Sequence, residues 1–224
     1  MAPGPEPTDS AERLVFFTDA VVAIALTLLI LPLVDLVPEA SRSGVHLPDL
    51  LRENLAELGS FLLSFVVIFR LWWAHHQLFR HVSGLNPTLV RWTVVWLLSI
   101  VFLPWPTAVI TAYDTSSLTV LLYTGTLVVS TGSLAAMALV VHRNPALSAG
   151  RSRETREDVL ASASSFVALV VALVLGTVFV DSVNYRALLL LFVTGPVERL
   201  VERRWAKHPE ASAAEVREVG TDVG

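Results

Sequence analysis

Long apolar runs without a single charged residue constrain this chain more than any other feature. They cover residues 20–34, 58–69, 92–113, 115–141 and 159–180. A helix of about 18 or more apolar residues is long enough to cross the hydrocarbon core of a bilayer, and several of these runs reach that length. One such run could be a buried core helix, but five of them in 224 residues leave too little polar chain to cover them. The sequence therefore predicts an all-α integral membrane protein.

Composition supports this prediction and excludes several kinds of chemistry. Charged residues make up 16% of the chain and the mean hydropathy is +0.63, whereas a soluble domain carries about 25% charged residues. Without cysteine there is no disulfide, thiol nucleophile or cysteine metal site. We also find no hydrolase triad, phosphate-binding glycine loop or metal-ligand cluster. We therefore expect no enzyme, no cofactor, no bound metal and no nucleic-acid partner.

Six membrane spans are expected in each subunit, and the sixth is weak. Their approximate limits are 13–34, 54–79, 88–112, 117–142, 158–181 and, for the sixth, an apolar run of only 187–197. That run is shorter than the ~20 residues of a full crossing. It spans only if Asn184, Tyr185 and Arg186 lie at the interface, with the arginine side chain reaching toward water.

Basic side chains are distributed unequally between alternate loops. Arg80 and Arg91 flank the second-to-third loop, and the fourth-to-fifth loop and the C-terminal tail are also rich in arginine. The loops on the other side contain only Arg42, Arg52 and Arg186. The positive-inside rule then predicts a multi-pass protein of the cell membrane with both termini in the cytoplasm. This topology requires an even number of spans.

The chain is expected to divide into three parts. Residues 1–12 form a cytoplasmic N-terminal segment that lacks the basic region of a signal peptide, so the first span is expected to be retained. Residues 13–205 form the transmembrane domain. Residues 206–224 form a cytoplasmic tail, which is expected to be disordered because its residues are small, polar and charged.

Three ionisable residues lie inside expected spans, where they need partners. Asp19 is in the first span, and Arg70 and His75 are in the second; all three fall in the expected cytoplasmic half. Such groups more often hold helices together than relay protons. A proton-coupled transporter using these three residues is the alternative function, although the sequence shows no inverted repeat or pair of broken helices.

One face of the first span is a candidate pore lining. Ile24, Leu28 and Leu31 follow one another at i, i+4 and i+7 and lie about 120–180° from Asp19. Thr27 flanks this aliphatic stripe. If Asp19 faces its own bundle, the aliphatic stripe faces lipid or the copies of itself in an oligomer. Periodicity alone does not select this face, because a second stripe is equally apolar: Leu26, Ile30 and Leu33.

Four short motifs resemble the transmembrane protein 175 family of potassium channels. Residues 13–19, Arg-Leu-Val-Phe-Phe-Thr-Asp, resemble its Arg-x-x-x-Phe-Ser-Asp signature, with Thr18 in place of serine. Residues 23–31 match the run that follows the signature in prokaryotic members. Residues 72–76 look like its Trp-x-x-His-His and residues 102–104 like its Phe-x-Pro. The resemblance covers the first three helices and is that of a single-repeat prokaryotic member.

The resemblance implies a homotetramer of six-helix subunits around a central pore lined by the first helix. The successive pore constrictions would be Ile24, Leu28 and Leu31. The first helix would be locked to the second through six residues: Arg13, Phe17, Thr18 and Asp19 on the first, and Trp72 and His75 on the second. Potassium ions and membrane lipids are the implied partners.

A pore of this kind works without ligands for the ion. The chain has no Thr-Val-Gly-Tyr-Gly filter segment, and a ring of aliphatic side chains blocks ions by dewetting when it is narrow. When dilated it passes partly hydrated ions, so we expect modest selectivity based on the cost of dehydration. Acids near the mouths would concentrate cations, although each is more often an ordinary surface charge: Asp35 and Glu39 outside, and Glu6, Asp9 and Glu12 inside.

Overall fold

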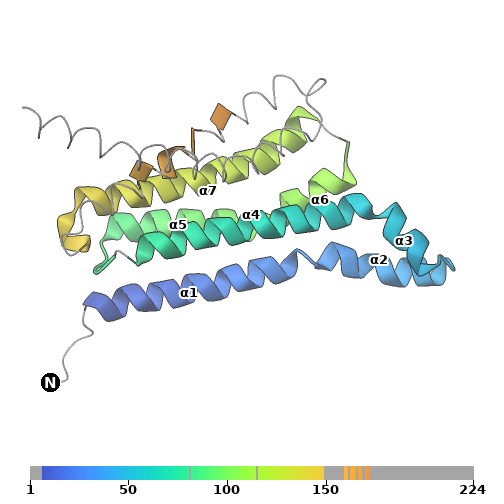
Figure 1. Ribbon diagram of the computed structural model, residues 1–224, viewed down its shortest axis with the longest axis horizontal. Helices are drawn as coiled ribbons and strands as arrows, with labels where there is room; N and C mark the ends of the chain where they lie inside the picture. Colours follow the sequence, from blue (N-terminus) through green and yellow to red (C-terminus); the bar gives the residue numbers. More distant parts are fainter. Residues whose placement is uncertain are drawn as a thin grey trace, which may run out of the picture. The chain divides into compact units, whose positions relative to one another are not determined.

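The described part of the protein is helical. A computed structural model describes residues 7–80, 82–114 and 116–148, together with a few positions between 159 and 171. The elements (Figure 1) are α1 (Pro7–Leu28), α2 (Leu31–Arg42), α3 (Leu47–Glu53), α4 (Leu55–Phe79), α5 (Pro87–Phe102), α6 (Pro104–Ala112), α7 (Ser117–Arg143) and the short 3-10 helix η1 (Pro145–Leu147).

Four stretches of the described residues are long and apolar enough to cross a membrane. They are Ser10–Arg42, Leu55–Phe79, Pro87–Ala112 and Ser117–Arg143. The last three match the second to fourth predicted spans to within one residue, whereas the first extends beyond the predicted 13–34 at both ends. The predicted sixth span and the tail lie outside the described residues, as does most of the fifth.

The first span is not the single helix over residues 13–34 that the sequence analysis expected. A turn at Leu29 and Ile30 separates α1 from α2, and α2 continues to Arg42. Pro32 accounts for the turn, because proline has no amide hydrogen and its ring clashes with the carbonyl four residues earlier, here that of Leu28. The Leu33 amide bonds to the Ile30 carbonyl, three residues back, at 3.0 Å, and the Val34 amide resumes the ordinary α-helical pattern with a 3.1 Å bond to the same carbonyl.

The third span is interrupted in the same way. The expected helix over residues 88–112 is divided at Leu103 into α5 and α6. Pro104 begins α6 and cannot donate a backbone hydrogen bond to α5. Leu103 itself keeps helical dihedral angles, so α5 and α6 form one interrupted span.

Side-chain caps fix where two of the long helices begin. The Asn86 side chain accepts a 2.7 Å hydrogen bond from the Leu89 amide at the start of α5. Ser116 and Thr119 cap α7 reciprocally, each side chain bonding the other residue's amide. Such caps satisfy amides that would otherwise have no partner in the first turn of a helix.

The spans pack side by side, with α5 against α7 and α4 against α1, α6 and α7 (Figure 1). Large side chains such as Trp96, Tyr123 and Met137 fill the interior. Ser64 on α4 joins two other helices there, because its Oγ lies 2.9 Å from Thr107 Oγ1 on α6 and 3.2 Å from the Tyr123 hydroxyl on α7. Hydrogen bonds between side chains hold helices together where lipid supplies no hydrophobic driving force.

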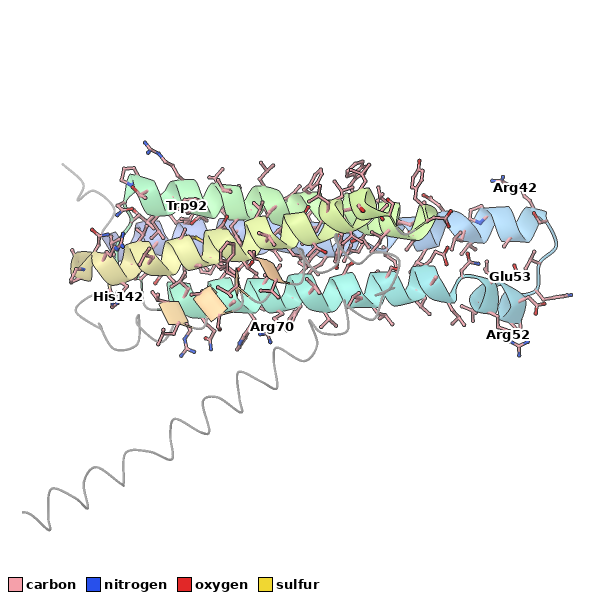
Figure 2. All side chains as sticks on the ribbon, turned by 90° about the horizontal axis from the view of Figure 1, so that it is seen from above. Arg42, Arg52, Glu53, Arg70, Trp92 and His142 are labelled. Carbon is pink, nitrogen blue, oxygen red and sulfur yellow. The ribbon has the colours of Figure 1, made fainter. Side chains whose placement is uncertain are left out.

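The two ends of this bundle differ. Arg42, Arg52 and Glu53 lie at the end that contains α3, whereas Trp92 and His142 lie at the opposite end (Figure 2). We call the first of these the α3 end. At the opposite end, the Ser83 amide donates a 2.6 Å hydrogen bond to the Leu147 carbonyl and ties two loops together.

Candidate functional site: the two faces of α1

One face of α1 is buried against the other helices. Its buried residues recur every three, four or seven positions: Ala11, Thr18, Val22, Ala25 and, just after α1, Leu29. This spacing places them on one side of a helix, and α1 packs against α4 and α5. The small side chains at positions 11, 18 and 25 allow close approach of the helix backbones.

A hydrogen bond links the edge of this buried face to α4. The indole Nε1 of Trp72 donates to Oδ1 of Asp19 at 2.7 Å. Trp72 also contacts Phe69 and His76, with ring centroids 5.3 and 5.6 Å apart. The adjacent Thr18 is fully buried and donates to the Val15 carbonyl at 2.8 Å. The structure therefore brings Asp19 and Trp72 together.

His75 stacks on two aromatic rings that lie outside the predicted set of six residues. Its imidazole stacks on the indole of Trp96 on α5, with centroids 4.2 Å apart and planes at 9°, and on the Phe79 ring at 4.4 Å. His75 is fully buried, and neither of its nitrogens has a hydrogen-bond partner among the described residues. It joins α4 to α5. Trp96 was not among the site residues predicted from the sequence. Its position inside the third predicted span was the one available signal.

The remaining residues of the expected lock lie on the exposed side of α1. Arg13 and Phe17 are both exposed. Of the six residues in that set, Asp19 and Trp72 are joined by a hydrogen bond. Thr18 on α1 and His75 on α4 are buried.

The aliphatic stripe lies on the exposed side of the span. The exposed fractions are 59% for Ile24, 40% for Leu28 and 50% for Leu31. Leu31 is the first residue of α2, so the stripe crosses the turn at Leu29 and Ile30. Thr27 is also exposed, and its hydroxyl bonds to the Ile24 carbonyl at 2.7 Å.

The second apolar stripe, which consists of Leu26, Ile30 and Leu33, is less exposed. Leu26 and Leu33 are half-buried, and Ile30 is 39% exposed. Burial therefore distinguishes two faces that periodicity could not. Within the part of the chain that the structure describes, no group of three or more histidine, aspartate or glutamate side chains could hold a metal ion.

Several apolar helical spans packed around a hydrogen-bonded interior define a multi-pass helical membrane protein. The family model of the endosomal/lysosomal potassium channel TMEM175 matches residues 13–104, which include α1 from Arg13 onward and the whole of α4. Over these residues the chain is similar to the TMEM175 family.

Individual relatives are named as channels. A potassium channel of Streptomyces collinus is 36% identical over 101 residues, which are 45% of this chain and 48% of the relative. A potassium channel of Chamaesiphon minutus is 32% identical over 114 residues, 50% of this chain and 55% of the relative. The chain thus matches about half the length of these curated relatives. The endosomal/lysosomal proton channel TMEM175 of Danio rerio is 26% identical over 121 residues, 54% of this chain and 23% of the relative.

Solved structures share the fold. The lysosomal potassium-selective channel TMEM175 homolog from Chamaesiphon minutus has a TM-score of 0.57 at 21% identity, over 83% of this chain and 96% of that one. A variant of the potassium channel MtTMEM175 gives 0.56 at 15% identity, over 87% and 93%. At these identities the likeness concerns the fold.

Proposed function

We propose that this protein is a potassium-permeable channel whose pore is lined by α1. The observation that carries the proposal is the division of α1 into two faces: one is buried and bonded to α4 through Asp19, and the other exposes the aliphatic stripe. The choice of potassium as the permeant ion rests on relatives that are named potassium channels. In the proposed assembly, four six-span subunits surround the axis in a cell membrane, with both termini cytoplasmic.

In this assembly the stripe supplies the constrictions. Ile24, Leu28 and Leu31 are aliphatic and exposed, so four copies would form successive rings without ligands for an ion. Narrow rings exclude water and block conduction, whereas dilated rings pass partly hydrated ions. Potassium loses its hydration water more readily than sodium, so we expect modest selectivity for potassium.

The Asp19–Trp72 bond sets the rotation of α1 in this proposal. A helix that is apolar all round has no strong preference for the side that it buries. A half-buried carboxylate inside a span does have one, because it must keep its hydrogen-bond donor. Holding Asp19 against Trp72 turns Ile24 and Leu28 away from the subunit's interior.

The turn at Leu29 and Ile30 divides the proposed pore lining. Ile24 and Leu28 belong to α1, whereas Leu31 begins α2, which packs against α4. The ring of Leu31 would therefore be positioned by α2 and not by the Asp19–Trp72 bond. We expect substitutions at Asp19 to affect the two rings of α1 more than the third.

A proton-coupled transporter is not favoured. Its proposed relay needs Asp19, Arg70 and His75 to exchange a proton, but Asp19 bonds to Trp72 and His75 stacks on Trp96. The relatives are also named as channels. Since the vertebrate relatives are named proton channels, the functional test should measure proton flux beside potassium flux.

Purified full-length protein in liposomes tests the proposal. Liposomes loaded with potassium salt and diluted into a sodium or an impermeant-cation buffer should release potassium down its gradient. Flux should continue without a pH gradient and should not saturate at low millimolar potassium. Flux equal to that of empty liposomes would reject a channel, and flux that requires a pH gradient would restore the transporter.

A further inference from the structure

The short helix α3 is amphipathic. At 100° per residue, Leu47, Leu50 and Leu51 fall within one arc of about 100°. The charged residues of the helix, Asp49, Arg52 and Glu53, fall on the opposite arc. An apolar face opposite a charged one is typical of a helix that lies at a boundary between apolar and aqueous surroundings.

The apolar face of α3 is not covered by the described residues. Leu47 is 68% exposed and Leu51 is 53% exposed, whereas Leu50 is half-buried. No residue of α3 is buried. In a soluble protein, a helix with this pattern would turn its leucines toward the interior. We therefore expect apolar surroundings around the exposed leucines of α3.

The position of α3 in the chain indicates which medium this is. Only Asn54 separates α3 from α4, a membrane span that starts at Leu55. Exposed leucines continue from α3 into α4: Leu51 is followed by Leu55 and Leu62. The surface of a span that is exposed in the subunit and purely apolar is in contact with lipid or with another subunit. The leucines of α3 continue that surface to its end.

The length of the first span places α3 at the level of the lipid headgroups. Ser10–Arg42 contains 33 residues, which at about 1.5 Å per residue extend well beyond a hydrocarbon core of about 30 Å. The end of α2 and the whole of α3 therefore lie near or beyond that core. Arg42, Arg52 and Glu53 at this end (Figure 2) are typical of the interface. So is the exposed Tyr113 at the end of α6.

We propose that α3 is an interfacial anchor whose partner is the lipid surface. Leu47 and Leu51 enter the boundary between headgroups and acyl chains, while Asp49, Arg52 and Glu53 remain in water. The anchor holds the connection between α2 and α4 against the membrane. This inference requires that the chain spans a membrane, but it does not depend on conduction.

The absence of cysteine from the chain makes a direct test possible. Leu51→Cys and Asp49→Cys place one nitroxide label on each face of α3 in the full-length protein, reconstituted in phosphatidylcholine vesicles. Spectroscopy then compares collisions with oxygen, which concentrates in lipid, and with a water-soluble nickel chelate. We expect the label at position 51 to favour oxygen several-fold over the chelate relative to the label at position 49.

Two results would overturn the proposal. If both labels collide freely with the nickel chelate, α3 lies in water. If the label at position 51 is shielded from both reagents, the leucines are covered by protein, which would be a second copy of the chain. Leu47→Cys provides an independent label on the same face if Leu51→Cys does not reconstitute.

Discussion

Trp72 on α4 donates a hydrogen bond of 2.7 Å from its indole Nε1 to the carboxylate of Asp19 on α1. The bond joins the first two membrane spans inside the half of the bundle opposite the α3 end. It places a charged acceptor where lipid could not solvate it, so the bond constrains the rotation of α1 more strongly than apolar contacts can. The aliphatic stripe lies on the exposed side of the same span.

Removing the indole donor should destabilise the protein. Trp72→Phe retains a large apolar ring but leaves the Asp19 carboxylate without this bond, and a hydrogen bond to a charged group contributes about 1.5–3 kcal/mol. Asp19→Asn should cost less, because the amide oxygen can still accept from the indole. Thermal unfolding in detergent, followed by size-exclusion chromatography, measures the effect.

The adjacent tryptophan provides the control for this experiment. Trp73 is exposed over about half of its surface, so Trp73→Phe should leave the unfolding midpoint almost unchanged. Equal midpoints for Trp72→Phe and Trp73→Phe would show that the Asp19–Trp72 bond has no structural role.

Two glycines of α7 should respond oppositely to alanine. A Cβ added at Gly132 would lie 3.0 Å from Cε2 of Phe166, whereas at Gly125 the nearest side-chain atom is 4.0 Å away, on Leu121. Gly125→Ala should stabilise α7 by up to about 1 kcal/mol, because glycine is a poor helix former. Gly132→Ala should show less gain or a net loss, since the Phe166 ring must move.

A second substitution separates the two effects at Gly132. Replacing Phe166 with leucine removes the ring atom that the new Cβ would meet, so Gly132→Ala should be better tolerated in a Phe166→Leu background. Unfolding midpoints of the two single variants and the double variant measure this coupling. Additive changes in the midpoint would mean that Phe166 does not pack on Gly132.

The hydroxyl group of Ser64 should matter more than that of Tyr123. Ser64→Ala removes the partner of both the Thr107 and the Tyr123 hydroxyls, whereas Tyr123→Phe removes only one of these two contacts. A hydrogen bond between membrane helices contributes about 0.6 kcal/mol and at most about 1.7 kcal/mol. The unfolding midpoint should therefore fall further for Ser64→Ala, and the reverse order would argue against the shared contact.

The first four spans could be predicted from the sequence because run length and hydropathy are properties of each segment alone. The turns at Leu29–Ile30 and Leu103 were not predicted, although Pro32 and Pro104 lie close to them. Hydropathy averages over a window and does not register the loss of a single backbone hydrogen bond. Length therefore predicted the spans, and local stereochemistry determined their interruptions.

The faces of α1 could be predicted only in part. Asp19 indicated that one side needs a partner, but every other side of the span is apolar, so the periodicity of Ile24, Leu28 and Leu31 was no clearer than that of its competitor. The stacking of His75 on Trp96 could not be predicted, because Trp96 comes from a third helix. Such contacts depend on packing between distant segments, which no local pattern encodes.

The most direct test of the account replaces Leu28 with alanine and measures potassium and sodium flux in liposomes. The shorter side chain widens the proposed ring, so Leu28→Ala should increase the flux and lower the ratio of potassium to sodium flux. Leu62→Ala, which shortens an exposed leucine on α4, should change neither. If the flux and the ratio for Leu28→Ala equal those of the unmodified protein, Leu28 does not line the pore and the proposed role of α1 is wrong.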